Sequence, residues 1–247
     1  MKIKIKNADE LKKLLDSLAL DIVDANIYYI LYSNLNDSIN DNTREFSQSN
    51  TFWSLTFDSL QDALMFRLCR AFDQESKSLN LFNLLMTIKT NVHFFEENHF
   101  RERLKDNAFV ESLAEDDHIP IESQLDKDIW FASDQNYLVK KLMIWRNNIF
   151  AHKGTKASLG ENKILVDNPL SEQELKTLLD ESFSIVNRYS SLYQASTWSR
   201  KIVGQDDYKS LLKFIKLGLQ KWDEDNAKEL QEIKRKQAQQ DNPSDGL

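Results

Sequence analysis

The sequence predicts an all-α fold, and three observations support this expectation. Apolar residues recur three and four positions apart over long stretches, which is the period of an amphipathic helix. The chain of 247 residues holds only five glycines and three prolines, whereas an all-β protein with many turns needs more of both. We find no internal repeat and no clear interdomain linker in the sequence. We therefore expect a single α-helical bundle of about six helices.

The first half of the chain holds three of the predicted helices. Apolar residues at helical spacing predict a long first helix over residues 9–36, and an Asn- and Ser-rich stretch interrupts the pattern over residues 34–50. The same spacing predicts a second helix over residues 57–72 and a third over residues 81–95. The acidic stretch 105–124 has no such period, so we expect a loop there with at most one helical turn.

The fourth and fifth helices follow this loop. Apolar residues spaced by four, three and four positions predict a helix over residues 138–149, and Gly154 is well placed to cap its end. Ser171 and Glu174 form a capping-box pattern, which predicts the start of a helix. The fifth helix is then expected over residues 175–189.

The sixth helix is extended and changes character along its length. Apolar residues at helical spacing occupy residues 208–222, but from Ala227 onward Lys, Glu and Gln dominate. A helix without an apolar face gains little from packing and frays at its end. We therefore predict an α-helical domain over residues 1–226 and a charged, fraying C-terminal tail over residues 227–247.

Composition points to a cytoplasmic protein. Cys69 is the one cysteine, which excludes an internal disulfide and fits a reducing compartment. No apolar run approaches the roughly 18–20 residues that a membrane span needs, and the first residues lack the apolar segment of a signal peptide. The net charge of −7 argues against a protein that coats nucleic acid nonspecifically, although a small basic cleft remains compatible with it.

One window of the chain is strongly basic. Residues 137–160 contain five basic residues and no Asp or Glu, which leaves 27 basic against 39 acidic residues elsewhere. The five are Lys140, Lys141, Arg146, Lys153 and Lys156. The window also contains His152. Arg supplies a fixed charge with forked donors and His titrates near neutral pH, so this pair is suited to handling a phosphate.

The spacing of Arg146 and His152 restricts how they could act. On an ideal helix, residues six positions apart diverge by about 120° and are separated by about 9 Å along the axis. Either the helix loosens before His152, or two copies of the site meet across a dimer axis. The alternative is structural: Arg146 pairs with a buried carboxylate, and His152 binds a loop carbonyl near the helix end.

The segment from Trp145 to Lys153, W-R-N-N-I-F-A-H-K, resembles the motif of the HEPN superfamily in its AbiU-like abortive-infection branch. HEPN domains are helical bundles whose signature is an Arg, a polar residue and then a His. Residues 67–73, R-L-C-R-A-F-D, and the following Ser-rich stretch with residues 81–85 also resemble this branch. The resemblance covers about residues 10–200.

The resemblance implies metal-independent cleavage of RNA in phage defence or toxin–antitoxin biology, without a cofactor. His152 would activate the ribose 2′-hydroxyl or protonate the leaving oxygen. Arg146 would stabilise the phosphorane, and Asn147 would orient the backbone or His152. The products would be a 2′,3′-cyclic phosphate and a 5′-hydroxyl. The resemblance also implies a homodimer with a composite site, and an antitoxin or regulatory protein is a further candidate partner. The candidates for RNA binding are Lys140, Lys141, Lys153 and Lys156.

Two other functional classes stay open. Many HEPN domains are inactive modules that bind a protein, a nucleic acid or a nucleotide, and this is the second hypothesis. The third hypothesis is a plain helical scaffold in which Arg146 is a structural ion. Asp73 is expected to form a structural ion pair, with Arg70 one turn away or with Arg146 across the bundle. Cys69 is expected in the core rather than as a nucleophile.

Two histidines have a spacing to glutamates that is found in metal sites. Glu96 with His99, and Glu115 with His118, have the Glu-x-x-His spacing of di-iron bundles. Such a site also needs a Glu from each of two other helices, and the second pair leads straight into Pro120. We therefore expect no metal site.

Overall fold

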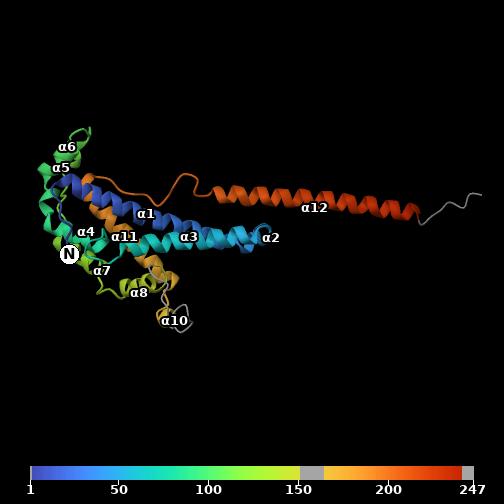
Figure 1. Ribbon diagram of the computed structural model, residues 1–247. Helices are drawn as coiled ribbons and strands as arrows, with labels where there is room; N and C mark the ends of the chain where they lie inside the picture. The colour runs from blue at the N-terminus through green and yellow to red at the C-terminus, as the bar shows by residue number, and fades with distance from the viewer. Residues whose placement is uncertain (1, 151–163, 241–247) are drawn as a thin grey trace, which may run out of the picture. The chain divides into compact units, whose positions relative to one another are not determined.

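The computed structural model describes residues 2–150 and 164–240, and within these ranges it is all-α with no β-strand, as the sequence predicts. Figure 1 shows the helices in chain order. They are α1 (Ala8–Ser38), α2 (Thr43–Ser47), α3 (Asn50–Ala71), α4 (Leu81–Thr90), α5 (Glu97–Arg103), α6 (Val110–Leu113), α7 (Glu122–Ala132), α8 (Tyr137–Trp145), α10 (Ile164–Asp167), α11 (Glu172–Gln194) and α12 (Asp207–Gln240). Short 3₁₀ turns η1 (Asn40–Asn42) and η2 (Val92–Phe95) join some of them, and a π-helical turn, η3 (Arg146–Phe150), follows α8.

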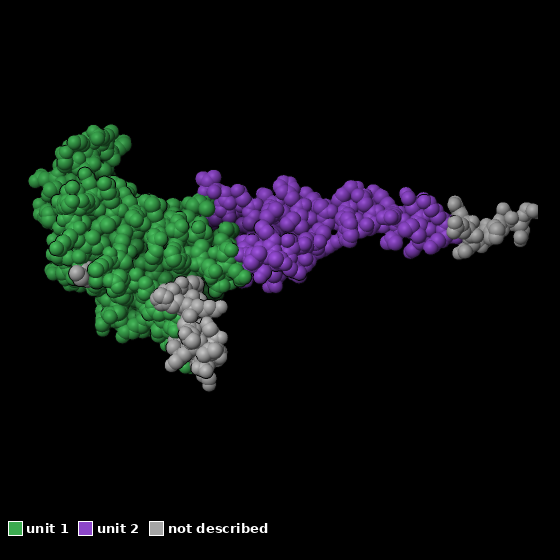
Figure 2. Space-filling model, in the orientation of Figure 1, with its two compact units in different colours: residues 1–32, 58–202 green, residues 33–57, 203–247 purple. Residues whose placement is uncertain are grey.

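The chain forms two compact units, coloured separately in Figure 2. The first comprises residues 1–32 and 58–202, and the second comprises residues 33–57 and 203–247. Both α1 and α3 pass from one unit into the other. The predicted boundary at residue 226 marks where apolar residues become rare along the last helix, whereas the two units are defined by contacts in the structure. The predicted boundary stays a prediction.

The core of the first unit is built from the apolar faces of α1, α3, α4, α7, α8 and α11. Its largest fully buried side chains include Phe72, Phe95, Tyr189 and Tyr193. The hydroxyl of Tyr193 donates to the backbone carbonyl of Ala8 at 2.7 Å, which ties the end of α11 to the start of α1. This core fixes the position of α8 and, with it, of the start of η3.

Two buried carboxylates in this unit are paired across helices. Asp128 of α7 accepts hydrogen bonds from the hydroxyl of Tyr189 at 2.8 Å and from Gln124 at 2.9 Å, and it forms an ion pair with Arg188. On the other side of the core, Asp21 of α1 pairs with both Arg67 and Arg70 of α3. These pairs satisfy carboxylates that would be costly to bury alone.

The second unit joins α2 to α12. Nη1 and Nη2 of Arg44 in α2 donate to the two carboxylate oxygens of Asp223 in α12, at 2.5 and 2.6 Å. Phe46 packs on Trp53 with their ring centres 4.6 Å apart, and Leu212 of α12 is buried. Beyond Asn226, all the side chains of α12 that the structure describes, as far as Ala238, are exposed.

The helix boundaries differ from the sequence prediction in places. The second predicted helix, residues 57–72, begins earlier, at Asn50 of α3, and the third, residues 81–95, ends at Thr90 with its last residues in η2. The expected loop 105–124 holds one short helix, α6, but α5 and α7 on either side of it were not predicted. No helix in the described parts of the chain is long and apolar enough to cross a membrane.

Candidate functional site

The segment that carries Arg146 is positioned by α8. Asn136 caps this helix, because its side chain accepts a hydrogen bond from the backbone N–H of Leu138 at 3.0 Å. Leu138, Val139 and Leu142 are buried in the core and fix the rotation of the helix. The regular α-helix ends at Trp145, and Arg146 is the first residue of the π-helical turn. Such turns are rare and occur often at functional sites.

Arg146 lies at the margin of the core with one carboxylate beside it. Its Nη2 lies 3.3 Å from Oδ2 of Asp73, and its Nη1 donates to Oδ1 of Asn147 at 3.1 Å. The Arg146 side chain is 35 % exposed, whereas that of Asp73 is 13 % exposed. Of the two partners expected for Asp73, the structure shows Arg146, and Arg70 instead pairs with Asp21.

A pocket of about 640 Å³ opens beside Arg146. Its lining includes the carboxylates of Asp73, Glu75 and Asp134 and the cationic side chains of Lys140 and Arg146. Its volume is in the range of small-molecule and nucleotide sites. The pocket therefore places an arginine, a lysine and hydrogen-bond acceptors around one space.

The chain after residue 163 is tied back onto α8. The indole N–H of Trp145 donates to the carbonyl of Asn168 at 2.8 Å. Nζ of Lys141 donates to the carbonyl of Pro169 at 3.0 Å and lies 2.7 Å from Oε1 of Glu174. These contacts were not predicted, because they join residues more than 20 positions apart with no motif between them.

The candidate residues fall into three groups in the structure. Arg146, Asn147 and Lys140 lie together at the pocket beside η3. Lys141 is engaged by Glu174, although it keeps 26 % of its side chain exposed. His152, Lys153 and Lys156, and Gly154 with them, lie outside the described residues.

Cys69 is part of the core, as expected. It is a free thiol with 4 % of its surface exposed. Burial raises the pKa of the Cys69 thiol to about 12, and the nearby charge of Arg146 offsets this only in part. A thiol with this pKa is protonated at neutral pH and is a poor nucleophile.

The two histidines with Glu-x-x-His spacing, His99 and His118, lie next to aromatic rings and a backbone carbonyl. The ring of His118 stacks on Phe100 with centres 3.6 Å apart, and its Nε2 lies 2.8 Å from the carbonyl oxygen of Leu113. His99 lies near His93, with ring centres 6.1 Å apart. Within residues 2–150 and 164–240, we find no group of three or more His, Cys, Asp or Glu side chains that could hold a metal ion.

An all-α bundle that presents an arginine at the end of a core helix fits the HEPN class of proteins. A family model described as AbiU2, of the HEPN type, matches residues 8–214. Because the match spans most of the chain, the protein belongs to the HEPN AbiU2 family. No curated protein and no solved structure matches the chain.

Proposed function

We propose that this protein is a metal-independent endoribonuclease that acts in phage defence or in a toxin–antitoxin system. The observation that carries the proposal is the placement of Arg146. Its guanidinium stands at a π-helical turn, on the edge of a pocket, and among the described residues it forms an ion pair with one carboxylate, that of Asp73. Membership in the AbiU2 family supports the abortive-infection setting.

The Arg146–Asp73 contact is compatible with exchange for a phosphate. Charge-assisted N–H···O bonds are typically about 2.7–2.9 Å long, whereas this contact measures 3.3 Å. Arg146 is also accessible enough to meet a ligand at the pocket. A phosphate could thus bind the guanidinium with little loss of existing interaction energy.

In the proposed reaction His152 removes the proton from a ribose 2′-hydroxyl, and the oxygen attacks the adjacent phosphorus. Arg146 stabilises the negative charge that develops on the phosphorane. The bond to the 5′-oxygen then breaks, and that oxygen takes up a proton. This leaves a 2′,3′-cyclic phosphate and a 5′-hydroxyl. Asn147 orients the guanidinium through its side-chain carbonyl.

The proposal includes the partners of the site. Lys140, Lys153 and Lys156 would bind the RNA backbone, while Lys141 would need to leave Glu174 to do so. Two copies of the chain would complete the site in a cytoplasmic homodimer, under the control of an antitoxin or other regulatory protein. The alternative is a non-catalytic binding module, and the three carboxylates at the pocket favour it because they repel a polyanion.

The test uses purified wild-type protein, Arg146→Ala and His152→Ala with total cellular RNA in EDTA. We expect the wild type alone to cleave, leaving cyclic phosphates at the new 3′ ends. His93→Ala is the matched control, because His93 is exposed and distant in sequence from the motif, and it should cleave like the wild type. Cleavage by His152→Ala would rule out the proposed base, and an inactive wild type would favour the binding module.

A further inference from the structure

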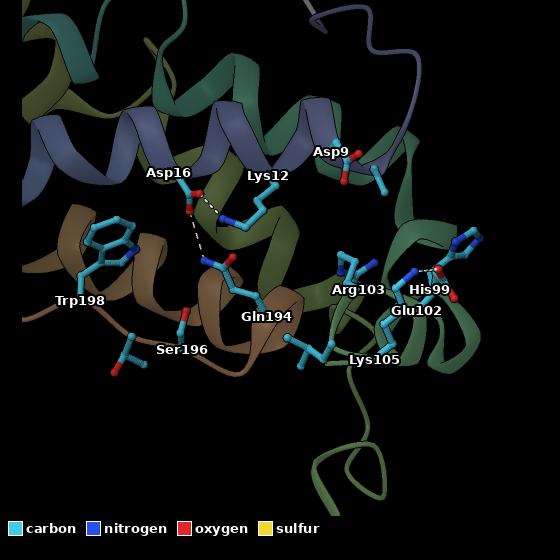
Figure 3. A pocket seen from close by; sticks show the side chains of 13 residues that line it. Asp9, Lys12, Asp16, His99, Glu102, Arg103, Lys105, Gln194, Ser196 and Trp198 are labelled. Atoms are coloured by element: carbon cyan, nitrogen blue, oxygen red, sulfur yellow. Dashed lines mark hydrogen bonds and ion pairs between the residues drawn. The ribbon is translucent and has the colours of Figure 1, made fainter. Parts of the chain in front are cut away.

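Another pocket of the first unit has a volume of about 670 Å³. Its lining residues are distant in sequence from Arg146. Figure 3 shows that its wall comes from the start of α1, from α5 and the residue pair after it, and from the end of α11 with the chain that follows. Arg103, the last residue of α5, forms part of this wall. The volume suits a small organic ligand.

The guanidinium of Arg103 is held by neutral groups. Its Nε donates to the carbonyl of Tyr193 at 3.0 Å, and its Nη1 donates to the carbonyl of Phe94 at 2.5 Å. The guanidinium carbon lies 3.8 Å from the centre of the Tyr193 ring. The Nη2 atom is buried, and no described residue accepts a hydrogen bond from it. Burial consequently lowers the pKa of the Arg103 guanidinium.

Arg103 differs in this respect from the other arginines. Among the described residues, every other arginine except the exposed Arg235 lies within 4.0 Å of a carboxylate oxygen. The paired ones are Arg44, Arg67, Arg70, Arg101, Arg146, Arg188 and Arg200. A partly buried cation without a counterion is costly to the fold, and a bound anion would relieve that cost.

The other charged groups of the pocket are largely neutralised by one another. Lys12 pairs with Asp16 at 2.5 Å, and Lys105 pairs with Glu102 at 2.9 Å. Asp9 lies in the first turn of α1, where the helix dipole stabilises a carboxylate. The lining holds three carboxylates and three Lys or Arg side chains, so it is neutral overall, but no carboxylate of the described residues lies within 4.0 Å of the Arg103 guanidinium.

We propose that this pocket binds a small organic oxyanion, with a carboxylate or phosphate group paired to the guanidinium of Arg103. Lys105 also lines the pocket beside its partner Glu102, and the hydroxyl of Thr197 supplies a hydrogen-bond donor. Nη2 of Arg103 is covered by protein atoms, so an oxyanion reaches it only if those atoms move as the ligand enters. This site shares no residue with the pocket beside Arg146.

The test is a series of thermal-shift and calorimetric titrations of the full chain at constant ionic strength. The probes are inorganic phosphate and adenosine monophosphate for the phosphate arm, and acetate and citrate for the carboxylate arm. We expect at least one probe to raise the melting temperature of the wild type and to bind about tenfold more weakly to Arg103→Gln. The arm that responds identifies the oxyanion.

Arg101→Gln is the matched control. Arg101 lies on the same helix but pairs with Glu97 and Glu111 and does not line the pocket, so this variant should bind like the wild type. If Arg103→Gln does not fold, Lys105→Ala and Thr197→Val replace it, and each should weaken binding at least threefold. Absence of binding by the wild type to all four probes would overturn the proposal, as would unchanged affinity in the pocket variants.

Discussion

Two carboxylates of this protein, Asp73 and Asp128, meet an arginine in different surroundings. Asp73 has one such contact, at 3.3 Å, beside an open pocket. Asp128 is buried and accepts hydrogen bonds from Tyr189 and Gln124 in addition to its ion pair. Partly exposed pairs are screened by water, whereas removal of one member of a buried network leaves its partners unsatisfied.

Substitution of these two residues should therefore have unequal effects on stability. We expect Asp73→Ala to lower the free energy of unfolding by about 1 kcal/mol, and Asp128→Ala to lower it by about 3 kcal/mol. Urea unfolding followed by circular dichroism measures both values. Equal costs would mean that Asp73 has a structural role as strong as that of Asp128, and Arg146 would then be less available to a ligand.

The buried thiol of Cys69 gives a second prediction at this scale. In the unfolded chain its pKa is about 8.5, and in the folded protein it is about 12. The unfolded state therefore loses its proton first as the pH rises, so this contribution to stability is intact below pH 8.5 and falls between there and pH 12.

Between pH 8 and pH 10 the wild type should lose on the order of 2 kcal/mol more unfolding free energy than Cys69→Ala does. Urea unfolding at the two pH values provides the comparison. The buried tyrosines also titrate late, but they are present in both proteins and cancel in the difference. Identical losses would mean that the thiol is accessible to water.

At the level of single helices, α11 is fixed differently at its two ends. Ser171 and Glu174 form a complete capping box at its start. The hydrogen bond from Lys141 and the backbone N–H of Ser171 lower the pKa of the Glu174 carboxyl, so this end of the helix should become less stable as the pH falls below about 4.3.

At the other end of α11, Ala195 has a left-handed backbone with φ of 49°. This conformation favours glycine.

Substitutions at the two ends of α11 should act in opposite directions. Ser171→Ala removes the cap and should lower the free energy of unfolding by about 1 kcal/mol. Ala195→Gly relieves the strained backbone and should raise it by about 0.5 kcal/mol. Thermal unfolding at pH 7 measures both. A loss of stability in Ala195→Gly would show that the flexibility of glycine in the unfolded chain outweighs the relief of strain.

The sequence predicted those helices whose apolar residues are frequent and regular. The range of α1 matches the predicted one within two residues at each end, and α11 contains the whole predicted range 175–189 but extends five residues beyond its end. Helix α7 was missed because its buried face includes Asp128, and the groups that satisfy this carboxylate lie 60 and 61 residues away in the sequence. A pattern read along the chain cannot show such long-range pairing.

A local pattern also shows only part of the candidate site. The motif identified Arg146, and the upstream resemblance identified Asp73, which the structure brings together. The π-helical turn and the hydrogen bond from Trp145 to Asn168 were not predicted. Both depend on how α8 packs in the folded chain rather than on the local pattern.

For the molecule as a whole, the last part of α12 contributes little to the core. Its described side chains beyond Asn226 are exposed, and Asp223, which binds Arg44, precedes them. Removal of residues 227–247 should therefore shift the melting temperature by no more than about 2 °C. Differential scanning calorimetry of the shortened chain tests this. A larger drop would show that the end of α12 packs against another part of the protein or a second copy of it.

The contacts that tie Asn168 and Pro169 back onto α8 have a consequence for changes in the length of the chain. Trp145 and Lys141 hold these two residues next to the helix. The entropic cost of holding the two ends of a chain segment together grows slowly with its length, by roughly 0.6 kcal/mol for each doubling. Variants with residues added or removed between Trp145 and Asn168 should therefore keep the bundle folded, so the spacing of Arg146 and His152 can be varied by experiment.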